Sequence, residues 1–121
     1  MDPERLRMLI VRLINSTRAG KLVWEATADE DTYRLTLNVG MVHIQRVKPQ
    51  AANVTFVGAP DAYRFSLFNP DNLLVAAFEG GQANEPLDYT LRELYEAARD
   101  AVLKPSEFFR EVEQEVIRRS G

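Results

Sequence analysis

Few side chains in this sequence have the type and spacing for chemistry, and the pair Gly20-Lys21 is the first to consider. A phosphate-binding P-loop needs the pattern G-x-x-x-x-G-K-[ST] between a strand and a following helix. Asn15 stands where the first glycine belongs, and Leu22 stands where the Mg²⁺-binding hydroxyl belongs. The order of elements is also reversed, because helical periodicity precedes Gly20 and a strand pattern follows it. The pair therefore predicts a corner in which Gly20 ends a helix in the left-handed conformation.

His43 is the only histidine of the chain, and there is no cysteine. A nucleophilic Ser-His or Cys-His site needs a base that a further group orients, and a zinc site needs several such ligands. Asp29, Glu30 and Asp31 share one turn, but they lack the alternating ligands and central glycine of a Ca²⁺-binding EF-hand loop. We therefore expect a protein that is not an enzyme, with no metal and no cofactor.

Pairing the predicted strands brings one group of polar side chains together on one face of the sheet. Residues 33–39 alternate between apolar and polar side chains, and residues 22–28 and 42–47 are their expected antiparallel neighbours. A loop at 29–32 and a two-residue turn at Gly40-Met41 place Trp24 opposite Leu37, and Leu37 opposite Ile44, on a buried face. The other face then presents the candidate binding residues, which are Glu25, Arg34, Asn38, His43 and Gln45, with Arg64 from a later strand.

A second hairpin is predicted from residues 63–68 and 73–78, which flank the type I turn Asn69-Pro70-Asp71-Asn72. Pairing Leu67 with Leu74 on the core face leaves an unusually apolar opposite face. Its candidate interface residues are Phe68, Leu73 and Val75. We expect either the final helix or another chain to cover them.

Helices are expected at both ends of the chain. Asp2 and Pro3 are suited to begin the first helix, whose apolar stripe runs from Leu6 to Thr17. Thr90-Leu91-Arg92-Glu93 resembles a capping box that begins a second helix, and Lys104-Pro105 ends it. Ser106 is the expected cap of a last helix, whose stripe is Phe109, Val112 and Val116.

These elements predict a single α+β domain over residues 1–121. Its N-terminal helix is followed by an antiparallel meander of five to six strands and by two C-terminal helices, with the helices packed on one face of the sheet. The sixth strand depends on the short segment 54–57, which Gly58 and Pro60 interrupt.

The net charge and the hydropathy of the sequence limit the classes of partner that the protein could bind. The net charge is −3, and basic residues are in excess only in residues 1–24. This distribution argues against nucleic acid and against a membrane surface, which both require clustered Lys and Arg. No apolar run approaches the roughly 20 residues that span a bilayer, and the acidic start is unlike a secretory signal. We expect a cytoplasmic location.

Several segments together resemble a set of small bacterial proteins without an established activity. The resemblance rests on Gly20-Lys21-Leu22-x-Trp24-Glu25, on the strands 33–37, 42–44 and 63–67, and on Leu94-Tyr95-x-x-Ala98-Arg99. It covers about residues 9–103 and implies a shared fold without supplying a function.

The leading functional hypothesis is therefore a non-enzymatic interaction or regulatory module that acts through the outer face of its sheet. Its partner is expected to be another protein or a second copy. Two alternatives stay open. One is an acidic dimeric protein similar to small secretion chaperones, and the other is a small-molecule-binding domain that uses Glu25, Arg34 and His43.

Overall fold

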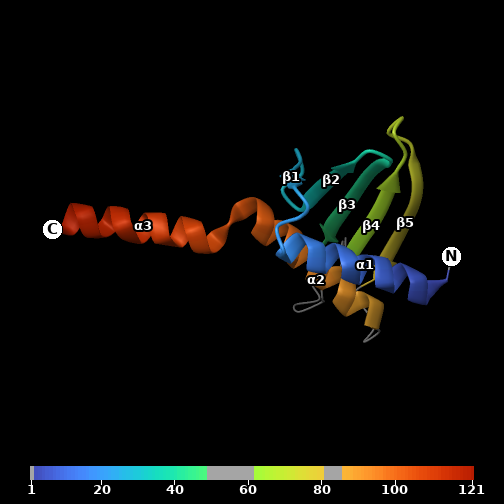
Figure 1. The fold of residues 1–121 in the computed structure, drawn as a ribbon, viewed down its shortest axis with the longest axis horizontal. Coiled ribbons are helices and arrows are strands. Elements are labelled where there is room, and N and C mark those ends of the chain that lie inside the picture. The colour runs from blue at the N-terminus through green and yellow to red at the C-terminus, as the bar shows by residue number, and fades with distance from the viewer. Residues whose placement is uncertain (1, 49–61, 81–85) are drawn as a thin grey trace, which may run out of the picture.

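A computed structural model describes residues 2–48, 62–80 and 86–121 of the protein (Figure 1). The predicted short strand at 54–57 lies outside these residues. The described elements are, in chain order, α1 (Pro3–Arg18), β1 (Trp24–Ala26), β2 (Thr32–Leu37), β3 (Gly40–Val47), β4 (Ala62–Phe68), β5 (Leu74–Gly80), α2 (Pro86–Leu103) and α3 (Pro105–Ser120).

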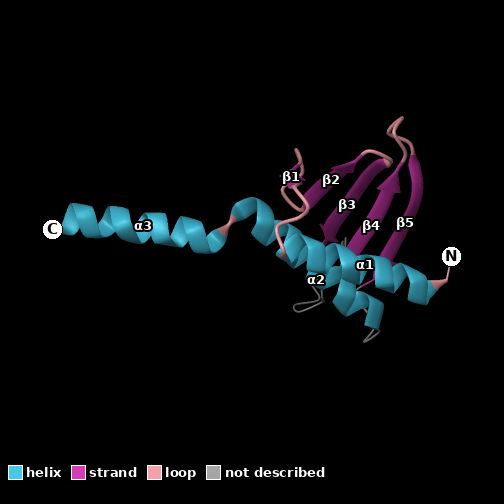
Figure 2. Ribbon diagram, viewed as in Figure 1, coloured by secondary structure: helices cyan, strands magenta, loops and turns pink. Residues whose placement is uncertain are grey.

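The five strands form one antiparallel sheet in the order β1-β2-β3-β4-β5, so each strand pairs with its neighbour along the chain. Helices α1 and α2 lie side by side against one face of this sheet, and none of the described helices covers the other face (Figure 2). The predicted fold class is confirmed. None of the helices in the described ranges combines the length and the apolar character that crossing a membrane requires.

Helix α1 has the boundaries that its sequence predicts. Asp2 accepts a hydrogen bond from the backbone N–H of Glu4 at 3.0 Å, and Pro3 occupies the first turn. At the other end Gly20 has a φ of +75°, and the N–H of Lys21 donates to the carbonyl of Ser16 at 2.9 Å. A left-handed glycine that closes a helix in this way confirms the corner.

The core lies between the two helices and the inner face of the sheet. Its fully buried side chains include Ile10 from α1, Leu35, Ile44 and Phe65 from the sheet, and Leu94 from α2. Trp24 is buried as predicted, and its indole N–H donates to the Thr17 hydroxyl at 2.8 Å. That hydroxyl in turn donates to the carbonyl of Leu13 at 2.6 Å, so the one buried indole donor is satisfied inside the core.

The predicted registers of the first three strands are wrong, although the predicted faces of Trp24, Leu35 and Ile44 are correct. Trp24 pairs with Leu35 instead of Leu37, and the second turn consists of Asn38-Val39 instead of Gly40-Met41. Gly40 has a φ of +148°, and a Cβ on it would stand 2.2 Å from the carbonyl oxygen of Phe68. Glycine is therefore required where β3 begins beside β4, and the turn moves to the residues before it.

The register between β4 and β5 also departs from the prediction. Leu67 pairs with Ala76 and Phe68 pairs with Leu74, which leaves Val75 as the extra residue of a β-bulge. A bulge reverses the inward and outward alternation of the residues beyond it. Leu74 consequently borders the outer face, while Val75 lines a cavity together with Leu9 of α1.

The two C-terminal helices begin elsewhere than their sequence patterns predict. α2 starts at Pro86, so Thr90 is a buried residue inside the helix and is not its cap. Lys104 separates the helices in a left-handed conformation with φ +48°, and it takes the N-cap position predicted for Ser106. Beyond it, α3 extends away from the sheet and buries none of its side chains (Figure 1).

Candidate functional site

The outer face of the sheet, which α1 and α2 leave uncovered, carries one continuous cross-strand row of side chains. Residues on neighbouring strands pair so that one rung contains Glu25, Arg34, His43, Ser66 and Ala77, in that order from β1 to β5. The next rung contains Thr32, Gln45, Arg64 and Glu79. Because side chains alternate along each strand, these two rungs share the face opposite the core.

Two ion pairs lie at opposite ends of this surface. Arg34 and Glu25 are directly opposite on β2 and β1, with 2.9 Å between guanidinium nitrogen and carboxylate oxygen. Arg64 and Glu79 are opposite on β4 and β5, and the Arg64 Nε donates to Glu79 Oε1 at 2.7 Å. Both pairs are exposed, so each contributes at most about 1 kcal/mol to stability.

His43 occupies the middle of the surface, between these ion pairs. Its ring packs against the ring of Phe68 with 4.6 Å between centroids. Burial lowers the pKa of His43 below its usual value, and the positive charge of Arg34 lowers the pKa further. The imidazole is therefore neutral near pH 7. Among the described residues its buried Nε2 atom has no hydrogen-bond partner, so Nε2 does not activate the Ser66 hydroxyl across from it.

A shallow depression of about 580 Å³ lies over β3, β4 and β5 on this face. The aromatic ring of Phe68 and the side chain of Leu74 form its apolar end, and Arg64 and Glu79 form its charged end. His43 lies between the two ends. The residues that line it are His43, Gln45, Arg64, Ser66, Phe68, Leu74, Ala77 and Glu79.

Most of the residues predicted for binding lie on this face. Glu25, Arg34, His43, Gln45 and Arg64 occupy the two rungs, but Asn38 lies in the β2–β3 turn and does not join them. Of the residues predicted for an interface, Phe68 lines the depression and Leu73 lies exposed in the β4–β5 turn. Val75 lines the cavity on the α1 side instead, because the bulge reverses its orientation.

Glu79 and Leu74 were missed by the sequence prediction. Glu79 lies beyond the predicted strand, which ended at residue 78, and the bulge turns Leu74 from the predicted core face to the outer face. One signal was available for Glu79, since the observed register sets it opposite Arg64 and cross-strand pairs of opposite charge are favourable. The bulge that reorients Leu74 has no comparable signal in the sequence.

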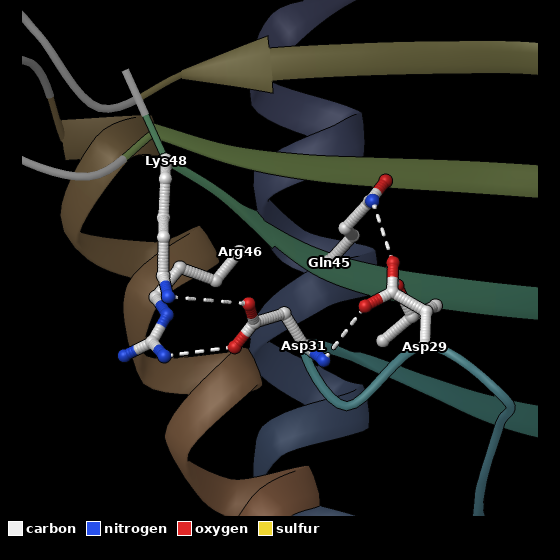
Figure 3. A network of polar contacts seen from close by, with 6 residues as sticks. Asp29, Asp31, Gln45, Arg46 and Lys48 are labelled. Carbon is white, nitrogen blue, oxygen red and sulfur yellow. Dashed lines mark hydrogen bonds and ion pairs between the residues drawn. The ribbon is translucent and has the colours of Figure 1, made fainter. Parts of the chain in front are cut away.

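A second polar cluster lies at the end of the sheet where β1 turns into β2 (Figure 3). Asp31 pairs with Arg46 at 2.8 Å and with Lys48 at 4.0 Å. Asp29 accepts hydrogen bonds from the backbone N–H of Asp31 at 3.0 Å and from the Gln45 amide at 3.2 Å. These hydrogen bonds, with one from Thr32, lower the pKa of the Asp29 carboxyl, the backbone bond contributing most.

This cluster continues into the helix layer through Tyr95 of α2. The guanidinium of Arg46 lies 5.6 Å from the centre of the Tyr95 ring, which also contacts the rings of Tyr33 and Tyr63. Burial raises the pKa of Tyr95 to about 12, so the phenol stays protonated. An adjoining cavity of about 500 Å³ is lined by residues that include Arg99 and Leu103. Sequence reasoning recognised the acidic turn and missed its basic and aromatic partners.

Residues 2–48, 62–80 and 86–121 contain no group of three or more His, Asp or Glu side chains that could hold a metal ion. Neither surface is therefore a candidate metal centre. The fold and the surface together define a small α+β domain whose antiparallel sheet is covered on one face by α1 and α2, while no helix in the described ranges covers the other. Comparisons with protein-family models, with curated proteins and with solved structures give no match for this chain. The proposed function therefore rests on geometry alone, and the resemblance to small bacterial proteins stays a prediction.

Proposed function

We propose that this protein is a non-enzymatic interaction module that binds a protein partner through the outer face of its sheet. The observation that carries the proposal is the depression over β3, β4 and β5, which joins a partly buried aromatic end to a charged end. Aromatic and Arg side chains supply most of the binding energy in protein interfaces, within a rim of polar groups. Phe68 and Arg64 provide both kinds of group about two rungs apart.

The edge strand β5 extends this surface. Leu74 is 58% exposed, and Ala77 and Glu79 are exposed on the same strand. An edge strand presents unpaired backbone N–H and C=O groups, with which an extended segment of a partner can pair. A partner that lies across Phe68 and reaches β5 therefore gains side-chain and main-chain contacts together.

Site-specific photo-crosslinking in cells tests the proposal. A photoreactive side chain at Ala77 on the outer face is expected to capture a discrete protein, whereas the same group at the exposed Asp100 of α2 is not. The variant Phe68→Asp is expected to abolish the cross-link at Ala77, and circular dichroism is expected to show that the variant remains folded at the temperature of the experiment. Identical products from the two positions, or a product that survives Phe68→Asp, would contradict the proposal.

The volume of the depression favours one alternative, a small-molecule site. Ligand pockets commonly measure about 300–1,000 Å³, and the depression falls within this range. A thermal-shift screen distinguishes the alternatives, because a small ligand raises the melting temperature of the wild type and not that of Arg64→Ala. If no compound shifts the wild type, the protein-partner proposal is favoured.

A further inference from the structure

Helix α3 and the far end of the sheet each expose an apolar surface that lacks a partner among the described residues. On α3, hereafter the arm, the apolar stripe consists of Phe108, Phe109, Val112 and Val116 at helical spacing, and no residue of the arm is buried. The second surface, hereafter the tip groove, is a cavity of about 300 Å³ beside the β2–β3 turn. Its apolar lining includes Leu9, Leu13, Leu37, Val39, Leu67 and Val75.

We infer that the protein forms a two-fold dimer in which the arm of each copy docks into the tip groove of the other. The tip groove shares Phe68 with the depression on the outer face, but Val39 lines the tip groove alone and the arm stripe lies on neither rung, so the inference does not rest on the proposed function. Apolar helix faces bind apolar grooves through residues at i, i+3, i+4 and i+7. Phe109, Val112 and Val116 occupy the i, i+3 and i+7 positions of this pattern, and Phe108 lies four residues before Val112 on the same side of the arm.

The arm cannot fill the groove of its own chain. Leu103, which precedes the arm, lines the same cavity as Arg46, whereas Gly40 lines the tip groove. The six residue steps of β3 from Gly40 to Arg46 measure about 20 Å. Phe108 and Phe109 lie only about 5–6 Å along the arm from Pro105, so its largest apolar side chains fall short of that groove.

Charge favours a second copy as the occupant. Arg5 and Arg12 are exposed on α1 at four residues before and three residues after Leu9, so they flank the groove. Neither forms an ion pair within the part of the chain that the structure describes. On the arm, Glu111 and Glu115 each follow a stripe residue by three positions. Docking therefore brings an acidic edge of the arm to a basic rim of the groove.

The surface area that each arrangement buries favours reciprocal docking of arm and groove over a dimer in which only the two arms pair. The arm has 16 residues and is about 24 Å long, so a strip about 10 Å wide covers roughly 250 Å² on each surface. One arm-to-arm contact then buries about 500 Å² in total, which is typical of non-specific contacts. Two reciprocal contacts bury about 1,000 Å², the lower limit of a specific interface.

Sedimentation equilibrium on the full chain tests this dimer. The wild type is expected to show twice the mass of its 13.8 kDa chain in the micromolar range. Val112→Asp in the arm stripe and Val39→Asp in the groove are each expected to weaken dimerisation at least tenfold. Their matched controls are Gln114→Asp on the opposite side of the arm and Val23→Asp, an equally exposed valine outside both surfaces. Circular dichroism confirms that each variant is folded.

Mixing the two defective variants gives the decisive result. In a mixed dimer the intact arm of Val39→Asp meets the intact groove of Val112→Asp, so one of the two contacts is restored. We expect the mixture to associate more strongly than either variant alone but more weakly than the wild type, because only one of the two contacts is intact. A monomeric wild type at 100 μM would overturn the inference. So would a dimer that resists Val39→Asp, which indicates arm-to-arm pairing, or a mixture without complementation.

Discussion

Ile44 and His43 are consecutive residues of β3, yet they belong to two chemically different faces of one sheet. Ile44 is fully buried beneath the helices, whereas His43 borders an open depression among charged side chains. The inner face joins strands to α1 and α2 and supplies most of the stability, because hydrophobic burial dominates folding. The outer face is not covered by the described helices, so we expect it to contribute less to stability than the inner face.

The sharpest test of this comparison uses two phenylalanines of the same strand. Phe65 is fully buried on the inner face, and Phe68 is partly buried on the outer face. Phe65→Ala removes core contacts and leaves a cavity, so we expect a loss of about 3–5 kcal/mol in the free energy of unfolding. Phe68→Ala is expected to cost less than half of that. Urea denaturation measures both values, and equal costs would show that the outer face is structural.

A smaller effect is expected from the hydrogen bond that ties α1 to β1. Thr17→Val keeps the shape of the side chain but leaves the indole N–H of Trp24 without its acceptor in the core. An unsatisfied buried donor costs about 1–3 kcal/mol. Thr36→Val, at an exposed outer-face position, is the matched control and is expected to change stability by less than about 0.5 kcal/mol. Equal effects of the two substitutions would mean that this hydrogen bond does not stabilise the fold.

The contrast between the faces could be predicted from the sequence, whereas the registers could not. Trp24, Leu35 and Ile44 were placed on one face and Glu25 on the other, and the structure agrees. The pairings of β1 with β2 and of β2 with β3 are displaced by an even number of residues, and because side chains alternate with period two, an even displacement preserves the faces. Alternation alone therefore predicted most of the site.

The remaining errors have local backbone causes. The close approach of Gly40 to the Phe68 carbonyl fixes the β2–β3 turn, and this contact depends on β4, which is distant in the sequence. The bulge at Val75 is likewise a property of two paired strands. A sequence pattern reports the preference of one segment at a time, so contacts of this kind escape it.

The smallest predicted effect concerns the dependence of stability on pH. It tests whether the outer face shields His43 from water enough to lower its pKa. The folded-state pKa of His43 lies below the value of about 6.5 that it has when unfolded. The unfolded chain consequently binds more protons between these two values, so stability is complete above about pH 6.5 and falls as the pH drops through the folded-state pKa. Burial and the positive charge of Arg34 on the same face both oppose protonation of His43.

Replacing this one histidine isolates its contribution. We expect the free energy of unfolding of the wild type to fall more between pH 7.5 and pH 5.5 than that of His43→Asn, because no other histidine titrates in this range. The imidazole resonances in an NMR titration report the folded-state pKa directly. A value at or above 6.5 would show that His43 is well solvated and that the ring of Phe68 does not shield it. In that case the outer face would be an ordinary solvent-exposed surface, and its contrast with the inner face would extend no further than burial.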